Sequence, residues 1–496
     1  MKNKIIDLLA AQIEGMSKED ISATIEIPPK PEMGDFAFPC FRLAKTMHKA
    51  PNMIAADIKE AIGDVDYLDR IEVKGAYLNF FVKTEVFVKS MIEAANSENF
   101  GGSDIGEGKN ICLDYSSPNV AKNFHVGHLR TTIIGNSLYK IFSKLGYNAI
   151  RINHLGDWGT QFGKLIVAYK AWGSKEAVEK DGISELMKLY VKFHEEADKN
   201  PELVDEARAW FAKMEQGDEE ALSIWQWFKD ISLVEYKRTY DLLGVDFDYY
   251  LGESFYRDKC QEVVDKITEA GLLKESEGAM IVDLSEYDMA PCIITKKDGS
   301  SIYATRDLAA IFYRKKTYNF CKCLYVTGQE QKLHFAQVFK VVELLGNEWA
   351  KDQLVHIPYG LVSLEGAKLS TRNGNIIYAE DILHDAIEKS LEIITEKSPN
   401  LENKEEVAKM VGVGSVLFND LYNQRIKDVS FSWDKVLNFD GETGPYVQYT
   451  HARCSSVVRL AENFDPSNEV DFSVITEPDA IFLLKEINRF PKVVLD

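Results

Sequence analysis

The sequence has no apolar run near the ~20 residues that a membrane-spanning helix requires. Its 7 cysteines include no Cys-x-x-Cys pair, and the closest two, Cys321 and Cys323, lie in an apolar stretch that indicates a structural role. No small-residue cleavage site follows the first residues, so we interpret them as a helix and not as a secretion signal. These absences predict a cytoplasmic protein with no membrane partner and no cysteine zinc site.

Two patterns that commonly bind nucleotide phosphates are also missing. No Gly-x-x-x-x-Gly-Lys-Ser/Thr follows a strand, which excludes a P-loop, and the dinucleotide fingerprint Gly-x-Gly-x-x-Gly is absent. The formal net charge of −20 argues against a protein that coats nucleic acid non-specifically. It still permits binding through local basic and aromatic patches.

The length of 496 residues predicts about three domains. Residues 1–105 mix helix and strand patterns, including a hairpin at 70–83, and a linker rich in Gly, Ser and Asn covers 97–110. Residues 106–380 alternate strands with helices and contain a charged helical insertion near 170–250. Residues 381–496 are helical, and the chain shows no internal repeat.

The region 106–380 has the pattern of a parallel α/β sheet. Apolar strands are predicted at 110–115 and 148–153, and further strand signals lie at 278–284, 291–305, 322–328 and 354–366. The helix between the first two strands starts at His125 and ends at Gly146, with an inward face made of Leu129, Ile133, Leu138, Ile141 and Leu145. This alternation predicts a parallel sheet, which binds ligands at the carboxyl ends of its strands.

The stretch "NFHVGHLRTT" at 123–132 places two histidines, His125 and His128, on one face of the helix start. Backbone N–H groups and the helix dipole favour phosphate at such a position. Gly127 between them has no side chain, so a ligand can approach the backbone. A metal site is the alternative, but it needs a third ligand, and Asp114 is the only nearby carboxylate that the pattern offers. We therefore predict a phosphate site and no bound metal.

Several longer motifs resemble the class I aminoacyl-tRNA synthetases. "HVGH" matches their HIGH motif, and "GAKLSTRNGN" at 366–375 fits their lysine-bearing downstream loop. The stretches "YSSPNVAKNFHVGHLRTTIIG", "NHLGDWGTQFGKLI", "IYATRDLAA", "GQEQKLHFAQ" and "GPYVQYTHAR" are together similar to arginyl-tRNA synthetases, from about residue 20 onward. The resemblance implies an α/β class I synthetase fold. It would comprise a Rossmann-like catalytic domain with a helical insertion, an N-terminal α+β domain and a C-terminal α-helical domain.

The same resemblance implies the activity and its residues. The chain would ligate L-arginine to its tRNA through an arginyl-adenylate, with ATP as substrate together with Mg2+, releasing pyrophosphate and AMP. The catalytic set would be His125, Gly127, His128, Lys122, Lys368, Ser370 and Arg372. The arginine-binding set would be Asp114, Asn119, Tyr303, Asp307 and Gln331, where the family often has Glu in place of Asp114. The ATP-binding set would be His125, His128, His154, Gly156, Asp157, Gln161 and Lys368, although the Gly156–Asp157 turn also suits a structural role.

The chemistry agrees with these residue types. Activation expels pyrophosphate, so the protein must hold two substrates in line and stabilise spreading negative charge. A guanidinium presents a planar fork of donors that a carboxylate such as Asp307 can accept. The second lysine of the family's K-M-S-K motif is replaced by Thr371 here, and we expect Lys122, three residues before His125, to supply the missing charge.

The outer regions resemble tRNA-binding domains. Tyr77 and Asn79 share a face of the predicted hairpin and are candidates for reading an unpaired D-loop base, although an ordinary half-buried strand explains them as well. "GPYVQYTHARCSSVVRL" matches the opening of the family's anticodon-binding domain, and the printed chain stops at "NRFPKVVLD", so we expect an incomplete helical domain. No heptad seam is visible, which predicts a monomer.

Three alternatives stay open at the level of sequence. A cysteinyl- or glutamyl-type synthetase would keep the chemistry but change the amino acid, although zinc-ligand cysteines are absent. A smaller nucleotidyltransferase with a HIGH motif would lack the outer domains. A non-catalytic tRNA-binding relative would have no need of "HVGH", "AKLSTR" and "YATRD" together.

Overall fold

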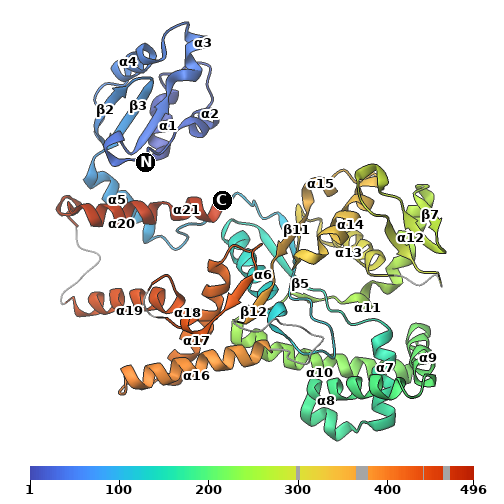
Figure 1. Ribbon diagram of the computed structural model, residues 1–496. Coiled ribbons are helices and arrows are strands. Elements are labelled where there is room, and N and C mark those ends of the chain that lie inside the picture. The colour runs from blue at the N-terminus through green and yellow to red at the C-terminus, as the bar shows by residue number, and fades with distance from the viewer. Residues whose placement is uncertain (298–301, 365–377, 439–440, 462–469) are drawn as a thin grey trace. The chain divides into compact units, whose positions relative to one another are not determined.

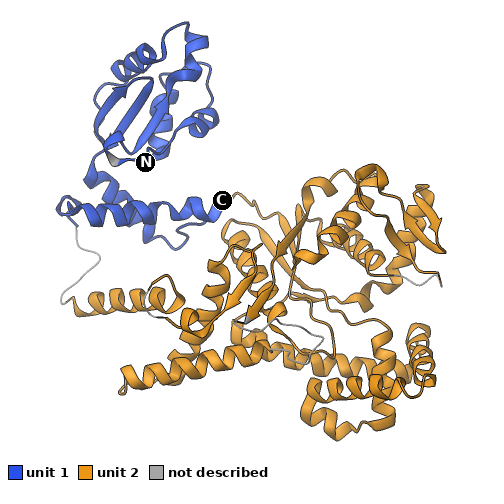
Figure 2. Ribbon diagram, viewed as in Figure 1, with its two compact units in different colours: residues 1–103, 463–496 blue, residues 104–462 orange. Residues whose placement is uncertain are grey.

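The computed structural model describes residues 1–297, 302–364, 378–438, 441–461 and 470–496. The chain divides into two compact units, residues 104–462 and residues 1–103 with 463–496 (Figure 2). None of the described helices combines the length and the apolar character needed to cross a bilayer.

A five-stranded parallel sheet forms the centre of the larger unit (Figure 1). Its order is β11-β10-β4-β5-β6, and every neighbouring pair is parallel. The strands are β4 (Asn110–Asp114), β5 (Asn148–Asn153), β6 (Tyr249–Tyr250), β10 (Lys322–Gly328) and β11 (Leu354–Tyr359). The parallel α/β sheet predicted from the alternation of strands and helices is therefore confirmed.

Helix α6 (Val126–Lys144) follows β4 and is buried on more than one side along its first three turns. It contacts β4, β5 and β10 of the sheet and also α16 (Ala379–Lys397) and α17 (Lys404–Tyr422). The predicted start and end agree with the structure, and Gly146 has the positive φ of 81° typical of a helix end. The predicted inward position of Ile141 is wrong. It is 37% exposed, whereas Leu145 of the same predicted face is buried, and no residue of α6 itself is buried after Asn136.

The helical insertion consists of α8 (Lys175–Ala197), α9 (Glu202–Gln216) and α10 (Glu219–Leu243), which pack on α7 (Thr160–Trp172). After it come α11 (Glu253–Tyr256), α12 (Cys260–Glu269) and an antiparallel sheet of β7 (Leu273–Ser276), β8 (Ala279–Val282) and β9 (Cys292–Thr295). The strand predicted at 291–305 is too long. β9 ends at Thr295, and Tyr303 already begins α13 (Tyr303–Tyr318). Helices α14 (Lys332–Leu344) and α15 (Ala350–Gln353) complete the core on that side.

The helical region after the sheet contains one strand that the sequence pattern did not predict. β13 (Val429–Phe431) pairs in parallel with β12 (Val362–Leu364), which leads out of the sheet domain. The remaining described α-helices of this unit are α18 (Trp433–Val436) and α19 (Gly444–Leu460). A strand of three residues has too short a pattern to distinguish it from a loop.

The smaller unit contains a three-stranded antiparallel sheet of order β1-β3-β2. The predicted hairpin is present as β2 (Leu68–Lys74) and β3 (Tyr77–Val82), and β1 (Phe36–Pro39) is a third strand that was not predicted. The helices of this unit are α1 (Lys2–Ala10), α2 (Lys18–Thr24), α3 (Ala44–Met47), α4 (Pro51–Ile62), α5 (Thr84–Ala95), α20 (Pro478–Asn488) and α21 (Phe490–Leu495). α20 packs on α5, and Lys485 pairs with Asp35 at 2.7 Å between Nζ and Oδ1.

Candidate active site

The loops that follow β4 and β5 at the edge of the sheet form a single structural unit. Asn119 and Gly156 make an isolated bridge between the two loops. The Gly156 N–H donates to the Pro118 carbonyl, and the Val120 N–H donates to the Gly156 carbonyl, both at 3.1 Å. A Cβ at Gly156 would lie 2.2 Å from Oδ1 of Asn119. Glycine is therefore required where the loops meet, and the predicted residues Asn119 and Gly156 lie next to each other.

His125 and His128 form a reciprocal cap at the N-terminus of α6. The Gly127 N–H donates to Nδ1 of His125 at 3.1 Å, and the His125 N–H donates to Nδ1 of His128 at 3.3 Å. In a neutral imidazole whose Nδ1 accepts, the proton is on Nε2. The helix N-terminus therefore carries two ring N–H donors in addition to its backbone amides.

Both histidines are held in the neutral form. Burial, followed by the charge of Lys122, lowers the pKa of His125 below its ordinary value. Burial lowers the pKa of His128 well below its ordinary value, and His125 and Lys122 act in the same direction. The Lys122 side chain is exposed, and its positive charge contributes to lowering the pKa of both rings. Among the described residues, the cation that acts on both rings is Lys122.

Gly127 is needed for the cap itself. A Cβ at this position would lie 2.9 Å from Cε1 and 3.0 Å from Nδ1 of His125. Such a contact would push the ring away from the backbone amide that it accepts. The absence of a side chain therefore protects the His125 cap, in addition to leaving the backbone accessible to a ligand.

The predicted residues Lys368, Ser370 and Arg372 lie outside the described residues. The chain on the far side of that gap returns directly beside the first motif. Tyr378 forms an antiparallel bridge with His125, and the Ala379 N–H donates to the Phe124 carbonyl at 2.9 Å. Residues 378–379, which follow the gap, are thus joined by backbone hydrogen bonds to residues 124–125 of the first motif.

Asp114, at the end of β4, already binds a guanidinium that belongs to the chain. Its Oδ2 lies 2.7 Å from Nη1 of Arg314, a fully buried residue of α13. Nη2 of Arg314 lies 3.1 Å from Nδ1 of His154. Oδ1 of Asp114 accepts from the Ser117 hydroxyl at 3.0 Å. Arg314 thus occupies one of the two carboxylate oxygens of Asp114, and the place of Asp114 in the arginine-binding set stays a prediction.

His154 is the third member of the cluster that it forms with Asp114 and Arg314. Its ring stacks on Tyr256 at 5.3 Å between centroids, with only 7° between the planes. Burial lowers its pKa, although the Asp114 carboxylate acts in the opposite direction. His154 is therefore neutral and held by contacts on two sides. Gln161, at the start of α7, is half-buried, and its side chain lies beside Gly159 in the preceding turn.

Asp157 is fully buried. Its carboxylate accepts from the Ser254 N–H at 2.8 Å, from the Ser254 hydroxyl at 2.7 Å and from Nζ of Lys229 at 2.6 Å. Its carbonyl accepts from Nε1 of Trp225 at 2.7 Å. With these partners and no exposed surface, Asp157 shapes the loop after β5. This arrangement favours the structural alternative for the Gly156–Asp157 turn, and the place of Asp157 in the ATP-binding set stays a prediction.

Asp307, on the first turns of α13, accepts a hydrogen bond from Nε2 of His334 on α14 at 2.6 Å. Both side chains are part-exposed, at 21% for Asp307 and 28% for His334. Tyr303, one turn before Asp307, is 68% exposed, and Gln331 is exposed at the end of η5 (Gln329–Gln331). These side chains are therefore accessible to a ligand, whereas Asp157 has no exposed surface and Asp114 is almost completely buried.

Sequence reasoning missed the partners Arg314 and His334. Arg314 lies seven residues after Asp307, two turns along α13, so the helical period places both on one side of that helix. His334 lies inside the motif "GQEQKLHFAQ". Spacing alone could have suggested both, but not the atoms that they contact.

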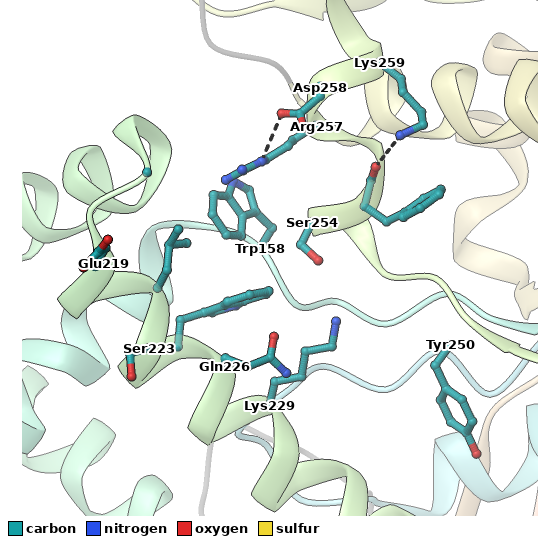
Figure 3. A pocket seen from close by; sticks show the side chains of 14 residues that line it. Trp158, Glu219, Ser223, Gln226, Lys229, Tyr250, Ser254, Arg257, Asp258 and Lys259 are labelled. Carbon is teal, nitrogen blue, oxygen red and sulfur yellow. Dashed lines mark hydrogen bonds and ion pairs between the residues drawn. The ribbon is translucent and has the colours of Figure 1, made fainter.

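A cavity of about 760 Å³ borders the loop after β5 and is lined by none of the predicted residues (Figure 3). Lys229 and Ser254, which hold Asp157, lie in its wall, and the Arg257 guanidinium covers the Trp158 ring at 4.8 Å. Among the polar groups drawn there, Arg257 pairs with Asp258 at 3.1 Å, and Lys259 donates to the Phe255 carbonyl at 3.0 Å. The cavity therefore adjoins the residues that hold Asp157, and Asp157 itself does not line it.

Tyr77 and Asn79 lie on β3 of the smaller unit. Tyr77 is half-buried and contacts Phe41 edge-on at 5.6 Å between ring centroids. Asn79 is only 3% exposed, because it occupies the central strand of its sheet. Asn79 therefore offers almost no surface for reading a base.

Within the described residues, no three His, Cys, Asp or Glu side chains gather closely enough to hold a metal ion. A carboxylate such as Asp114 is engaged by Arg314, and Asp157 by Lys229. A divalent cation that enters with a polyphosphate needs few protein ligands, because the phosphates provide several.

A parallel sheet whose first strand leads into His-x-Gly-His at a helix N-terminus defines a class I aminoacyl-tRNA synthetase. Comparison with known families identifies the subgroup. The model "tRNA synthetases class I (R), catalytic domain" matches residues 91–433, "Arginyl tRNA synthetase N terminal domain" matches 3–82, and "DALR anticodon binding domain" matches 447–496. The chain belongs to the arginyl-tRNA synthetase family.

Individual relatives agree. The arginine–tRNA ligase of Alkaliphilus metalliredigens is 56% identical over 497 residues, covering 100% of this chain and 88% of the relative. That of Clostridioides difficile is 54% identical, covering 100% and 87%. The arginyl-tRNA synthetase structure from Thermus thermophilus superposes with a TM-score of 0.77 over 95% of this chain and 83% of that one, at 23% identity, which supports the fold.

Proposed function

We propose that this chain charges arginine tRNA with L-arginine in an ATP-dependent reaction. Arginine attacks the α-phosphate of ATP to form arginyl-adenylate and pyrophosphate, and the activated arginine then passes to the tRNA with release of AMP. The observation that carries the proposal is the capped pair His125 and His128. Two neutral ring donors stand at a helix N-terminus, at the end of the first strand of a parallel sheet.

The phosphates bind at this helix end. The Nε2–H groups of His125 and His128 donate to phosphate oxygens, and the exposed Lys122 ammonium supplies charge where pyrophosphate leaves. Neutral donors bind ATP without adding cationic repulsion toward Lys122. Preorganised donors of this kind stabilise the charge that develops in the transition state. Lys368, Ser370 and Arg372 act from the second motif, and Gln161, His154 and Gly156 shape the ATP side of the site.

The arginine side chain binds at Asp307. The hydrogen bond from His334 fixes one carboxylate oxygen and leaves the other for a guanidinium donor. Tyr303, which is exposed, covers the aliphatic part of the substrate. Asn119 and Gln331 hold the amino and carboxylate groups. Asp114 acts mainly through Arg314 and His154, and its Oδ1 is the oxygen that can still accept from a ligand.

Magnesium enters with ATP and is held chiefly by the phosphates, and no zinc takes part. The tRNA is bound partly by the smaller unit, with Tyr77 as the stacking side chain and Asn79 as its support. The match of residues 447–496 to an anticodon-binding domain supports tRNA as the partner. The enzyme works as a monomer in the cytoplasm, with no membrane partner.

Aminoacylation of total tRNA with several labelled amino acids tests the proposal. Arginine alone should be charged, only with ATP and Mg2+ present, and EDTA should stop the reaction. Charging with cysteine or glutamate would indicate a synthetase of another specificity. tRNA binding with no amino acid charged would indicate a non-catalytic relative.

A further inference from the structure

Arg130 lies on α6, two residues after His128, and is only 1% exposed. Its guanidinium does not reach solvent or the predicted substrates. Nη1 donates to the carbonyls of Gly360 at 2.8 Å and Lys427 at 3.1 Å, and it lies 3.3 Å from that of Leu361. Nη2 donates to the Arg425 carbonyl at 3.2 Å. One side chain thus binds backbone from two segments that are more than 60 residues apart in sequence.

These two segments lie in direct backbone contact. The Gly360 N–H donates to the Arg425 carbonyl at 3.0 Å, and the Leu361 N–H donates to Oδ1 of Asp428 at 2.7 Å. A Cβ at Gly360 would lie 2.5 Å from the carbonyl carbon of Lys427. The contact continues into the β12–β13 pairing. Arg130 therefore binds backbone carbonyls where the sheet domain contacts the segment after α17.

Asp420, on α17, faces the same guanidinium. Its Oδ1 lies 3.2 Å from Nε of Arg130, within ion-pair distance but not aligned for a hydrogen bond, and its Oδ2 has no hydrogen-bond partner. The residue is 9% exposed, and a small cavity of about 20 Å³ adjoins the pair. A buried charge pair with imperfect geometry is a poor source of stability. The Arg130–Asp420 pair at this junction is therefore better explained by a role in positioning the segments that it joins than by a role in stability.

We propose that Arg130 is a positioning residue for arginine activation, which holds the first turns of α6, the turn before β12 and the loop after α17 in one register. A shift of α17 or of the loop at 425–428 moves the carbonyls that bind Arg130. Because Arg130 and the two capping histidines share the start of α6, the same shift moves the Nε2–H donors of His125 and His128. The helical segment thereby sets the geometry of the phosphate site. This inference rests on the proposed function, since arginine activation is its readout.

The test compares Arg130→Lys and Asp420→Asn in arginine-dependent pyrophosphate exchange with tRNA present. Lysine keeps the charge but replaces the planar fork with a point donor. We expect kcat to fall by about tenfold or more in each variant, with KM for ATP and for arginine within about threefold of wild type. Urea unfolding should show a folded chain at the assay temperature. Arg151→Lys, which alters the Arg151–Asp248 pair at the outer edge of the sheet, is the matched control and should leave kcat unchanged.

A double variant separates positioning from general damage. If the two residues act together, Asp420→Asn should change kcat little once Arg130 is lysine. Unchanged kcat in folded Arg130→Lys and Asp420→Asn, or loss through KM alone, would overturn the inference. If Arg130→Lys does not fold, Asp420→Asn decides. Failure of the wild-type chain to charge arginine would instead overturn the proposed function.

Discussion

The imidazole rings of His125 and His128 stack with centroids 3.9 Å apart and 26° between their planes. Each ring uses Nδ1 to accept a backbone N–H and so keeps Nε2–H for a ligand. Capping and ligand binding are therefore performed by opposite edges of the same rings. Substitutions that preserve one role and remove the other can separate them.

Replacement of His125 by asparagine should remove the ligand donor while keeping the cap. Asparagine is among the most favourable N-cap residues, so the melting temperature should change little. Loss of a donor to developing charge should lower kcat for arginine activation by about 10²-fold. His125→Ala, which loses the cap as well, should cost a further ~1 kcal/mol of stability. Equal activity of His125→Asn and wild type in pyrophosphate exchange would show that the ring only caps the helix.

Lys122→Ala should reduce tRNA-dependent pyrophosphate exchange by about 10²-fold, because the ammonium acts at the leaving pyrophosphate. The same change should raise the pKa of both histidines, since Lys122 lowers them. NMR titration of the histidine ring protons would show this shift independently of activity. Lys140→Ala, on an exposed part of α6, is the control. We expect Arg372→Ala to lower the rate less, and the reverse order would assign the missing charge to Arg372.

Asp307→Asn should raise the KM for arginine or lower kcat/KM by a hundredfold or more, with little change in ATP affinity. Breaking a buried charge pair on one side typically costs ~2–5 kcal/mol. His334→Ala should weaken arginine binding less, because it removes only the group that orients the carboxylate. Asp352→Asn, an exposed carboxylate on α15, is the control. Arginine kinetics within a few-fold of wild type in folded Asp307→Asn would place the guanidinium elsewhere.

Glu253, on α11, should make stability depend on pH. Its carboxylate pairs with Arg306 at 2.9 Å and is only 7% exposed, and burial raises its pKa to about 7 although Arg306 opposes this. Because the folded pKa exceeds the ordinary value of 4.5, the folded chain keeps a proton that the unfolded chain releases. This contribution is complete below pH 4.5 and is lost as the pH rises through 7.

The contribution of Glu253 to the free energy of unfolding falls by on the order of 3 kcal/mol between pH 4.5 and pH 7. Glu253→Gln cannot titrate, so its free energy of unfolding relative to wild type should increase from pH 5 to pH 8 by about this amount. Urea unfolding of both proteins at the two pH values measures the difference. A relative stability that is the same at both pH values would show that Glu253 is ionised in the folded chain throughout this range.

Much of the fold could be predicted because its patterns are local. The start and end of α6 depend on residues close to His125 and Gly146, and the strands at 110–114 and 148–153 are short apolar runs between turn signals. The error at Ile141 has a different origin. A helical period identifies which residues share a face, but the length of the buried stripe depends on where the sheet and α16–α17 stop covering it.

Sequence by itself determined the place of His125 and His128 at a helix start, the alternation that makes a parallel sheet, and the family, since each depends on residue types at fixed short spacings. Only the tertiary structure decided that Asp114 binds Arg314, that Asp157 is enclosed by Ser254 and Lys229, and that Arg130 joins carbonyls near residues 360 and 427. These partners are brought together by chain segments that close loops of tens to hundreds of residues. No local pattern encodes which buried charge meets which, because that choice follows from packing and desolvation of the whole core.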